Sequence, residues 1–95
     1  MKLLEFFFLK GGNNKSKYFT KEEVKKHNTV DDGMLIVNGF VYKIPEKWIT
    51  IDHPGGNVIS KYLGKDATNI FNKVHQSKGE NPFNILDSFK VGKLK

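Results

Sequence analysis

The residues best suited to chemistry in this chain are two histidines, each at the edge of an apolar run. His53 opens the motif His53-Pro54-Gly55-Gly56. The proline disfavours a helical backbone at His53, and the glycines permit a turn with positive φ and close approach to a bound object. His75 follows Phe71 by four residues and Ala67 by eight, so the three share one face of a predicted helix. Two imidazoles presented in this way can face each other across a flat, apolar slot.

A pair of facing imidazoles in an apolar setting suits the two axial positions of a haem iron. Iron with both positions filled has no open site, so the arrangement favours reversible one-electron transfer over oxygen activation, and we expect no enzymatic activity. The chain has no cysteine, which excludes disulfides, iron–sulfur clusters and covalent c-type attachment of haem. A zinc site would need a further ligand that this apolar setting does not supply, and each histidine taken alone would suit an ordinary loop or helix-capping role.

The segments around the two histidines also supply side chains that can pack against a flat ligand. The predicted set consists of the ligand loop and the apolar stripes of two helices: Pro54, Gly55, Gly56, Val58, Ile59, Leu63, Ile70, Phe71 and Val74. Each imidazole needs an acceptor for its second ring nitrogen, and we expect main-chain carbonyls near Gly55 and in the loop after His75 to provide it. The third histidine, His27, lies on a Lys-rich segment and is expected to be a surface or capping residue.

Several separated motifs agree in order and spacing with one known family. The His53-Pro54-Gly55-Gly56 motif, the run from Gly64 to Phe71 and the later His75 resemble the haem-binding core of the cytochrome b5 family, from about Tyr18 to Leu94. The resemblance implies an α+β fold, in which a small mixed β-sheet and short helices form a haem pocket. It also implies non-covalent haem b held by His53 and His75. The implied function is an electron carrier between a reductase and an acceptor such as a lipid-modifying oxidase or desaturase.

The same resemblance leaves a second function open, a haem- or sterol-interacting regulatory module without redox turnover. Such a module is similar to the steroid-binding relatives, which lack the paired histidines present here. The chain also departs from the family pattern at two positions. Met34 stands where many relatives have tryptophan, and Gln76 where many have serine, so a hydroxyl bond to a haem propionate would pass to Ser77 or Lys78.

Local patterns predict the elements that must position these residues. Thr20 and Glu23 form a capping box for a helix that runs to about His27, and Asn38-Gly39 between two β-rich runs is typical of a type I′ hairpin turn. The other expected elements are a strand at 18–19, a turn at 31–33, hairpin strands at 34–37 and 40–44, a helical turn after Pro45 with Trp48 in the core, helices from Asn57 to Gly64 and from Asp66 or Thr68 to His75, a short helix near 83–86, and a closing strand over 88–94.

Composition and length divide the chain into two parts. Residues 1–17 hold an apolar cluster and a Gly- and Asn-rich joint, and residues 18–95 form the haem-binding domain. The cluster is shorter than the roughly 20 apolar residues that cross a bilayer, and it lacks a signal-peptide cleavage site. We expect it to fold onto the domain, with weak contact to a membrane surface or a partner as the alternative. The chain as a whole is expected to be a soluble, cytoplasmic monomer, or a module excised from a larger enzyme.

Charge gives a further indication about partners. Sixteen lysines, ten acidic residues and no arginine give a formal charge of +6. The lysines are spread along the chain, unlike the clustered Lys and Arg of a nucleic-acid reader, so nucleic acid is not expected as a partner. The lysines that flank the two ligand segments are Lys61, Lys65, Lys73 and Lys78. They predict a positive or mixed redox face and acidic redox partners.

Overall fold

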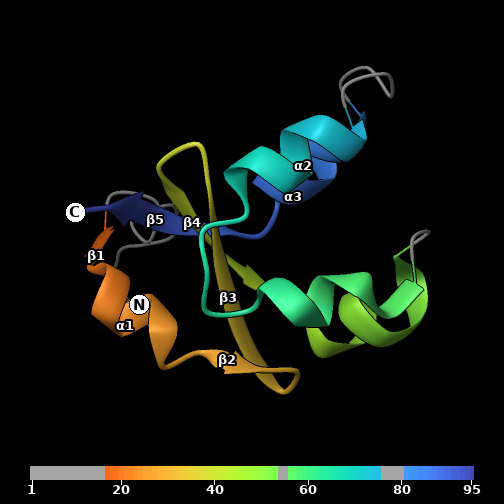
Figure 1. Ribbon diagram of the computed structural model, residues 1–95, viewed down its shortest axis with the longest axis horizontal. Coiled ribbons are helices and arrows are strands. Elements are labelled where there is room, and N and C mark those ends of the chain that lie inside the picture. Colours follow the sequence, from red (N-terminus) through yellow and green to blue (C-terminus); the bar gives the residue numbers. More distant parts are fainter. Residues whose placement is uncertain (1–16, 54–55, 76–80) are drawn as a thin grey trace, which may run out of the picture.

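A five-stranded mixed sheet forms the centre of the protein in a computed structural model, which describes residues 17–53, 56–75 and 81–95 (Figure 1). The strand order is β1-β5-β4-β3-β2, with β1 and β5 parallel and the other neighbours antiparallel. The strands are β1 Lys17–Phe19, β2 Asn28–Thr29, β3 Asp32–Val37, β4 Phe40–Ile44 and β5 Lys90–Leu94. The sheet and the short helices around it confirm the predicted α+β class.

The β3–β4 hairpin turns through the two residues that the sequence indicated. Asn38 has φ of 53° and Gly39 has φ of 81°, the positive pair that a type I′ turn requires. The predicted turn at residues 31–33 is wrong in its position. Asp32 and Gly33 belong to β3, because they pair with the short β2 strand, which the sequence did not predict, and the chain turns at 30–31 instead.

The two faces of the sheet have separate cores because side chains alternate along β3 and β4. Leu35 and Val37 of β3 lie with Tyr42 and Ile44 of β4 in the larger cluster, together with Ile49, Leu63, Ala67 and Leu86. Met34, Ile36 and Val41 lie in the second cluster with Phe19 and Val24. Figure 1 shows helix α1 on one side of the sheet and the later helical segments on the other.

Helix α1 (Lys21–Lys25) begins at the predicted capping box. Glu23 N donates to Thr20 Oγ1 (3.1 Å), and Thr20 N donates to Glu23 Oε1 (2.7 Å). The helix ends at Lys25, two residues before the expected end, with Lys26 as its C-cap. Val24 is its one fully buried side chain and anchors α1 to the second cluster.

The larger core is covered by two pairs of helical segments. A π-helical turn, η2 (Trp48–Asp52), precedes a 3₁₀ helix, η3 (Gly56–Tyr62). Helix α2 (Thr68–His75) precedes α3 (Asn81–Asp87). All four were expected as helical, and Gly64 follows η3 with φ of 80°, which ends the helical path as predicted. Within the described residues, no helix has the length and apolar character needed to cross a membrane.

Candidate haem-binding site

His53 ends the η2 segment in the conformation that the following proline demands. Its backbone has φ of −70° and ψ of 124°, which is extended, and its N–H donates to the Trp48 carbonyl (3.0 Å). The Trp48 ring meets the imidazole edge-on, with centroids 5.9 Å apart and planes at 66°. Trp48 also packs against the larger core and against Phe89, as expected of a core residue. The half-buried imidazole is therefore held in place by the hydrogen bond of its own backbone and by the contact with the Trp48 ring.

His75 is the last residue of α2, and a main-chain carbonyl fixes its ring. His75 Nδ1 lies 2.9 Å from the carbonyl oxygen of Phe71, one turn earlier in the same helix. A carbonyl oxygen only accepts, so Nδ1 holds the proton and Nε2 retains a lone pair for a metal ion. We expected this acceptor in the loop after His75; the helix itself supplies it, because residues i and i+4 lie one above the other.

A chain of aromatic contacts supports the His75 ring from the side. The Phe71 and His75 ring centroids are 4.3 Å apart, with planes at 49°. Phe71 in turn meets Phe83 of α3 edge-on at 5.1 Å. The imidazole of α2 is thus joined through Phe71 to Phe83 of α3.

The linker between η3 and α2 is attached to the edge of β3. Gly64 N donates to the Met34 carbonyl (2.6 Å), and Ala67 N donates to the Ile36 carbonyl (2.7 Å). Between them, Ile36 N donates to the Lys65 carbonyl (3.0 Å). The η2–η3 arm therefore ends, and the α2–α3 arm begins, at one linker that is bonded to β3, and Figure 1 shows both arms on the same side of the sheet.

A second attachment, which the sequence analysis missed, ties α2 to the β3–β4 turn. Asn38 N donates to Thr68 Oγ1 (2.8 Å), and Asn72 Nδ2 donates to Asn38 Oδ1 (3.2 Å). Asp66 Oδ1 accepts from both the amide and the hydroxyl of Thr68 (3.0 and 2.6 Å). The Asp66-x-Thr68 spacing is a local signal for a helix start, but the link to Asn38 spans 30 residues and has no local signal.

The predicted lining residues divide into three groups. Leu63 is buried within the larger core, and Ile59, Ile70 and Phe71 are partly buried against it. Val58 and Val74 are 42% and 50% exposed, and the neighbouring Phe83 is 39% exposed. Gly56 begins η3, whereas Pro54 and Gly55 lie outside the described residues. The arms thus have some apolar side chains packed against the core and others exposed to solvent, which fits a flat apolar ligand better than a polar one.

The lysines predicted to flank the site are exposed where they are described. Lys61 lies in η3, Lys65 in the linker and Lys73 in α2. Lys78, together with Gln76 and Ser77, lies outside the described residues. Asp52, Asp66 and Asp87 are also exposed on these segments, so three lysines face three acids there, and Asp87 is paired with Lys90 of β5.

Residues 20–95 match the family model described as the cytochrome b5-like haem/steroid-binding domain. The cytochrome b5 of rice (Oryza sativa subsp. japonica) is 41% identical over 83 residues, which cover 86% of this chain and 58% of that protein. The NADH nitrate reductase of spinach (Spinacia oleracea) is 37% identical over 83 residues, 86% of this chain and 8% of the reductase. Acyl-lipid (8-3)-desaturase B of Dictyostelium discoideum is 37% identical over 79 residues, 82% of this chain and 16% of the desaturase. The chain thus spans only part of each of these relatives.

Solved structures lead to the same family. The cytochrome b5 of Ostreococcus tauri virus 2 superposes with a TM-score of 0.68 at 33% identity, over 80% of this chain and 94% of that one. Cytochrome b558 of Ectothiorhodospira vacuolata, a prokaryotic homologue of cytochrome b5, also gives a TM-score of 0.68, at 25% identity over 84% of this chain and all of that one. Because the family model covers residues 20–95 and these solved structures share the fold, the chain belongs to the cytochrome b5 family of haem-binding domains.

Proposed function

We propose that this domain is a b-type electron carrier in which His53 and His75 are the two axial ligands of a non-covalently bound haem. The observation that carries the proposal is the hydrogen bond from His75 Nδ1 to the Phe71 carbonyl oxygen (2.9 Å). In the neutral imidazole this bond leaves the lone pair of Nε2 to bind the iron. The extended backbone and Trp48 contact of His53 support an equally constrained ring on the other arm. The family match at 20–95 supports residues 18–95 as the haem domain.

The remaining residues of the site have binding and insulating roles. Val58 of η3 and Val74 of α2 are exposed apolar side chains on the two arms, and burying them against a porphyrin removes apolar surface from water. Phe71 and Phe83 extend this apolar surface along α2 and α3. When bound, the haem supplies one-electron redox chemistry. The chain has no cysteine to tether a vinyl group, so ligation and packing alone would retain the porphyrin.

For the wider role, we propose electron transfer from a reductase to an acceptor such as a desaturase or another oxidoreductase. Support comes from the similarity to segments of proteins named nitrate reductase and acyl-lipid desaturase. The exposed Lys61 and Lys73 on the histidine-bearing arms, with Lys65 in the linker between them, favour acidic surfaces on the partners. A steroid-binding role would make no use of the fixed His75 ring, so we favour the redox function.

The test is reconstitution of the full chain with haemin, followed by absorption spectra before and after dithionite. Two imidazole ligands saturate the iron, so we expect low-spin spectra in both states and release of the haem by acid extraction. A high-spin ferric spectrum, or ready binding of cyanide or carbon monoxide, would contradict the paired ligation. Failure to take up haemin at a one-to-one ratio would contradict the function as a whole.

A further inference from the structure

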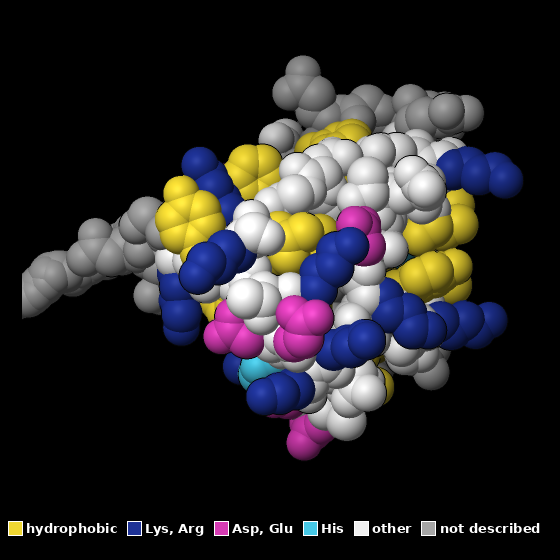
Figure 2. All heavy atoms as spheres, turned by 60° about the vertical axis from the view of Figure 1, so that its left-hand side comes forward, with side chains coloured by type: hydrophobic (Ala, Val, Ile, Leu, Met, Phe, Trp, Pro, Cys, Tyr) yellow, Lys and Arg dark blue, Asp and Glu magenta, His cyan; other side chains and the backbone are white. Residues whose placement is uncertain are grey.

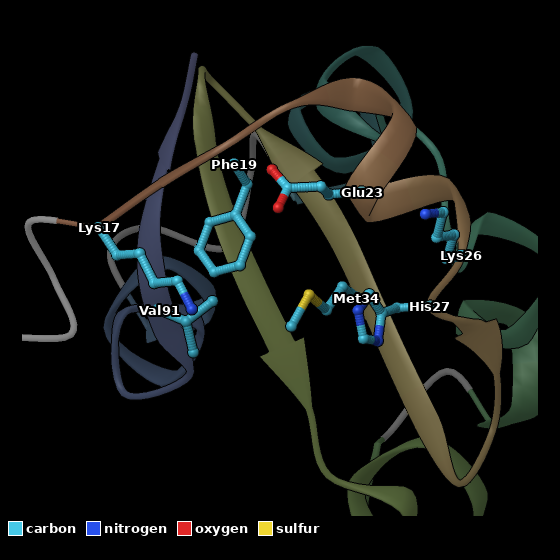
Figure 3. A pocket seen from close by; sticks show the side chains of 7 residues that line it. All are labelled: Lys17, Phe19, Glu23, Lys26, His27, Met34 and Val91. Atoms are coloured by element: carbon cyan, nitrogen blue, oxygen red, sulfur yellow. The ribbon is translucent and has the colours of Figure 1, made fainter.

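A cavity of about 460 Å³ lies between α1 and the sheet (Figure 3). Its residues come from β1, α1, β3 and β5 and include Phe19, Met34 and Val91. Met34 and Phe19 belong to the second core cluster, whereas the histidine-bearing arms cover the larger cluster. The sheet therefore separates this cavity from the candidate haem site.

The floor of the cavity is apolar. Phe19 and Met34 are each 7% exposed, and Val91 is partly buried against the same cluster. Figure 3 shows the three side chains turned toward a common space, with the His27 ring beside Met34. His27 Nδ1 is held 3.0 Å from Asp32 Oδ2, which fixes the ring as part of the wall. A volume of this size falls within the range of roughly 300 to 1,000 Å³ typical of small-molecule sites.

The rim of the cavity has an excess of positive charge. Lys17 Nζ lies 5.1 Å from the centroid of the Phe19 ring, and Lys26 is exposed at the C-cap of α1. Glu23 is the one acidic residue of the lining, and its Oε1 already accepts the Thr20 N–H of the capping box. Two ammonium groups therefore share the rim with one carboxylate, which leaves an excess of one positive charge. Figure 2, which turns the α1 side of Figure 1 forward, shows lysines beside apolar and acidic side chains on this face.

We propose that this cavity binds a small amphipathic anion, such as a medium-chain carboxylate. Its apolar chain would pack on Phe19, Met34 and Val91, and its acid group would lie between Lys17 and Lys26. Three apolar side chains and four charged or polar ones line the cavity, a division that suits an amphipathic ligand. The proposal does not depend on haem binding, because the two sites lie on opposite faces of the sheet.

Sodium octanoate is the probe for the test, titrated into the ¹⁵N-labelled full chain while amide chemical shifts are followed. We expect saturable shifts centred on Phe19, Met34 and Val91, with the same dissociation constant after reconstitution with haemin. Shifts centred on Val58, Phe71 and Val74 that vanish once haemin is bound would place octanoate in the haem site and overturn the proposal. Because the readout is local, it remains valid if the haem assignment fails.

Charge recognition is tested with variants that leave the core intact. Lys17→Gln and Lys26→Gln should each weaken octanoate binding about two- to fivefold, the change that one exposed ion pair produces. The matched control is Lys47→Gln, an exposed lysine at the start of η2, which should leave the dissociation constant unchanged. Neutral 1-octanol should bind more weakly than octanoate. Equal affinity for octanol, or an unchanged constant in the Lys17→Gln/Lys26→Gln double variant, would overturn the proposal.

Discussion

His75 and His27 differ in what holds their rings, and this supports different roles for the two residues. His75 Nδ1 contacts a main-chain carbonyl, which leaves the opposite nitrogen pointing away from its own helix turn. His27 Nδ1 contacts Asp32, which also forms an ion pair with Lys43 Nζ (3.4 Å). The prediction that His27 is a surface or capping residue is thus refined. It is half-buried and joins the loop after α1 to β3.

Replacement of the histidines should distinguish these roles. His53→Ala or His75→Ala should lose haem, or leave an open coordination position that binds carbon monoxide, because one imidazole then remains. His27→Ala should keep the low-spin spectrum and lose only a small part of the stability, because the broken contact to Asp32 is solvent-accessible. Absorption spectra and urea unfolding measure both effects. An unchanged haem spectrum in His75→Ala would remove that residue from the ligand set.

Asp32 should make stability depend on pH in the acid range. The hydrogen bond from His27, aided by Lys43, holds the pKa of the Asp32 carboxyl below its ordinary value of 3.8. Because the folded-state pKa is the lower one, the unfolded chain binds more protons in acid. The contribution of Asp32 is therefore present above the unfolded pKa and is lost as the pH falls through the folded one.

Urea unfolding between about pH 6 and about pH 2 measures this contribution as the change in unfolding free energy. Asp32→Asn should flatten the acid part of the stability curve. Asp31→Asn is the matched control, because Asp31 is an exposed neighbour for which the described residues provide no ion pair or hydrogen bond. An acid loss in Asp32→Asn equal to that of the unmodified chain would show that this ion pair does not set the slope.

At the scale of elements, the sequence predicted the caps and turns that depend on a few adjacent residues. The capping box at Thr20 and the turn at Asn38-Gly39 each depend on a few adjacent residues, and both formed as expected. The elbow at His53 follows from the adjacent proline, and its extended backbone was also predicted. The two histidine-bearing helical segments could be located for the same reason.

Elements that depend on distant partners were not predictable in the same way. The β2 strand has two residues and exists through its pairing with β3, and that pairing draws Asp32 and Gly33 out of the expected turn. The link from Asn38 to Thr68 and Asn72 requires the hairpin to be folded beside α2. The cavity under α1 assembles from four elements, so no single stretch of sequence indicates it.

Gly64 of the linker is predicted to tolerate a side chain less well than Gly39 of the β3–β4 turn. It has φ of 80°, and a Cβ at this position would lie 2.9 Å from Asn28 Cβ and 3.1 Å from the Lys25 carbonyl oxygen. Gly39 has nearly the same φ of 81° but nothing within 4 Å of its Cβ position. Gly39→Ala thus measures the cost of the left-handed backbone alone, roughly 1 to 2 kcal/mol. Gly64→Ala should cost more, since crowding is added. Equal losses of unfolding free energy in the two variants, measured with urea, would show that the linker accommodates the added Cβ without strain.

At the scale of the whole molecule, the sheet is a partition with different chemistry on its two faces. One face supports the histidine-bearing arms through β3 and the buried Leu63 and Ala67. The other face packs α1 over Met34 and Ile36 and leaves the cationic cavity beside it. The two sites lie on opposite faces of the sheet. The proposed ligand on the α1 side and a partner at the arms would therefore not compete for the same surface.

The choice of redox partner should follow the lysines on the histidine-bearing arms. Lys61, Lys65 and Lys73 are exposed there, and attraction between complementary surfaces raises the encounter rate most at low ionic strength. We expect the haem-loaded domain to react faster with an acidic small redox protein than with a basic one, and to slow by about tenfold or more as salt is added. Stopped-flow reduction measures these rates.

Lys61→Gln and Lys73→Gln should reduce the salt dependence, whereas Lys21→Gln on α1, across the sheet, should not. A faster reaction with the basic partner, slowed by salt, would show that acidic residues such as Asp52 and Asp66 dominate the encounter surface instead.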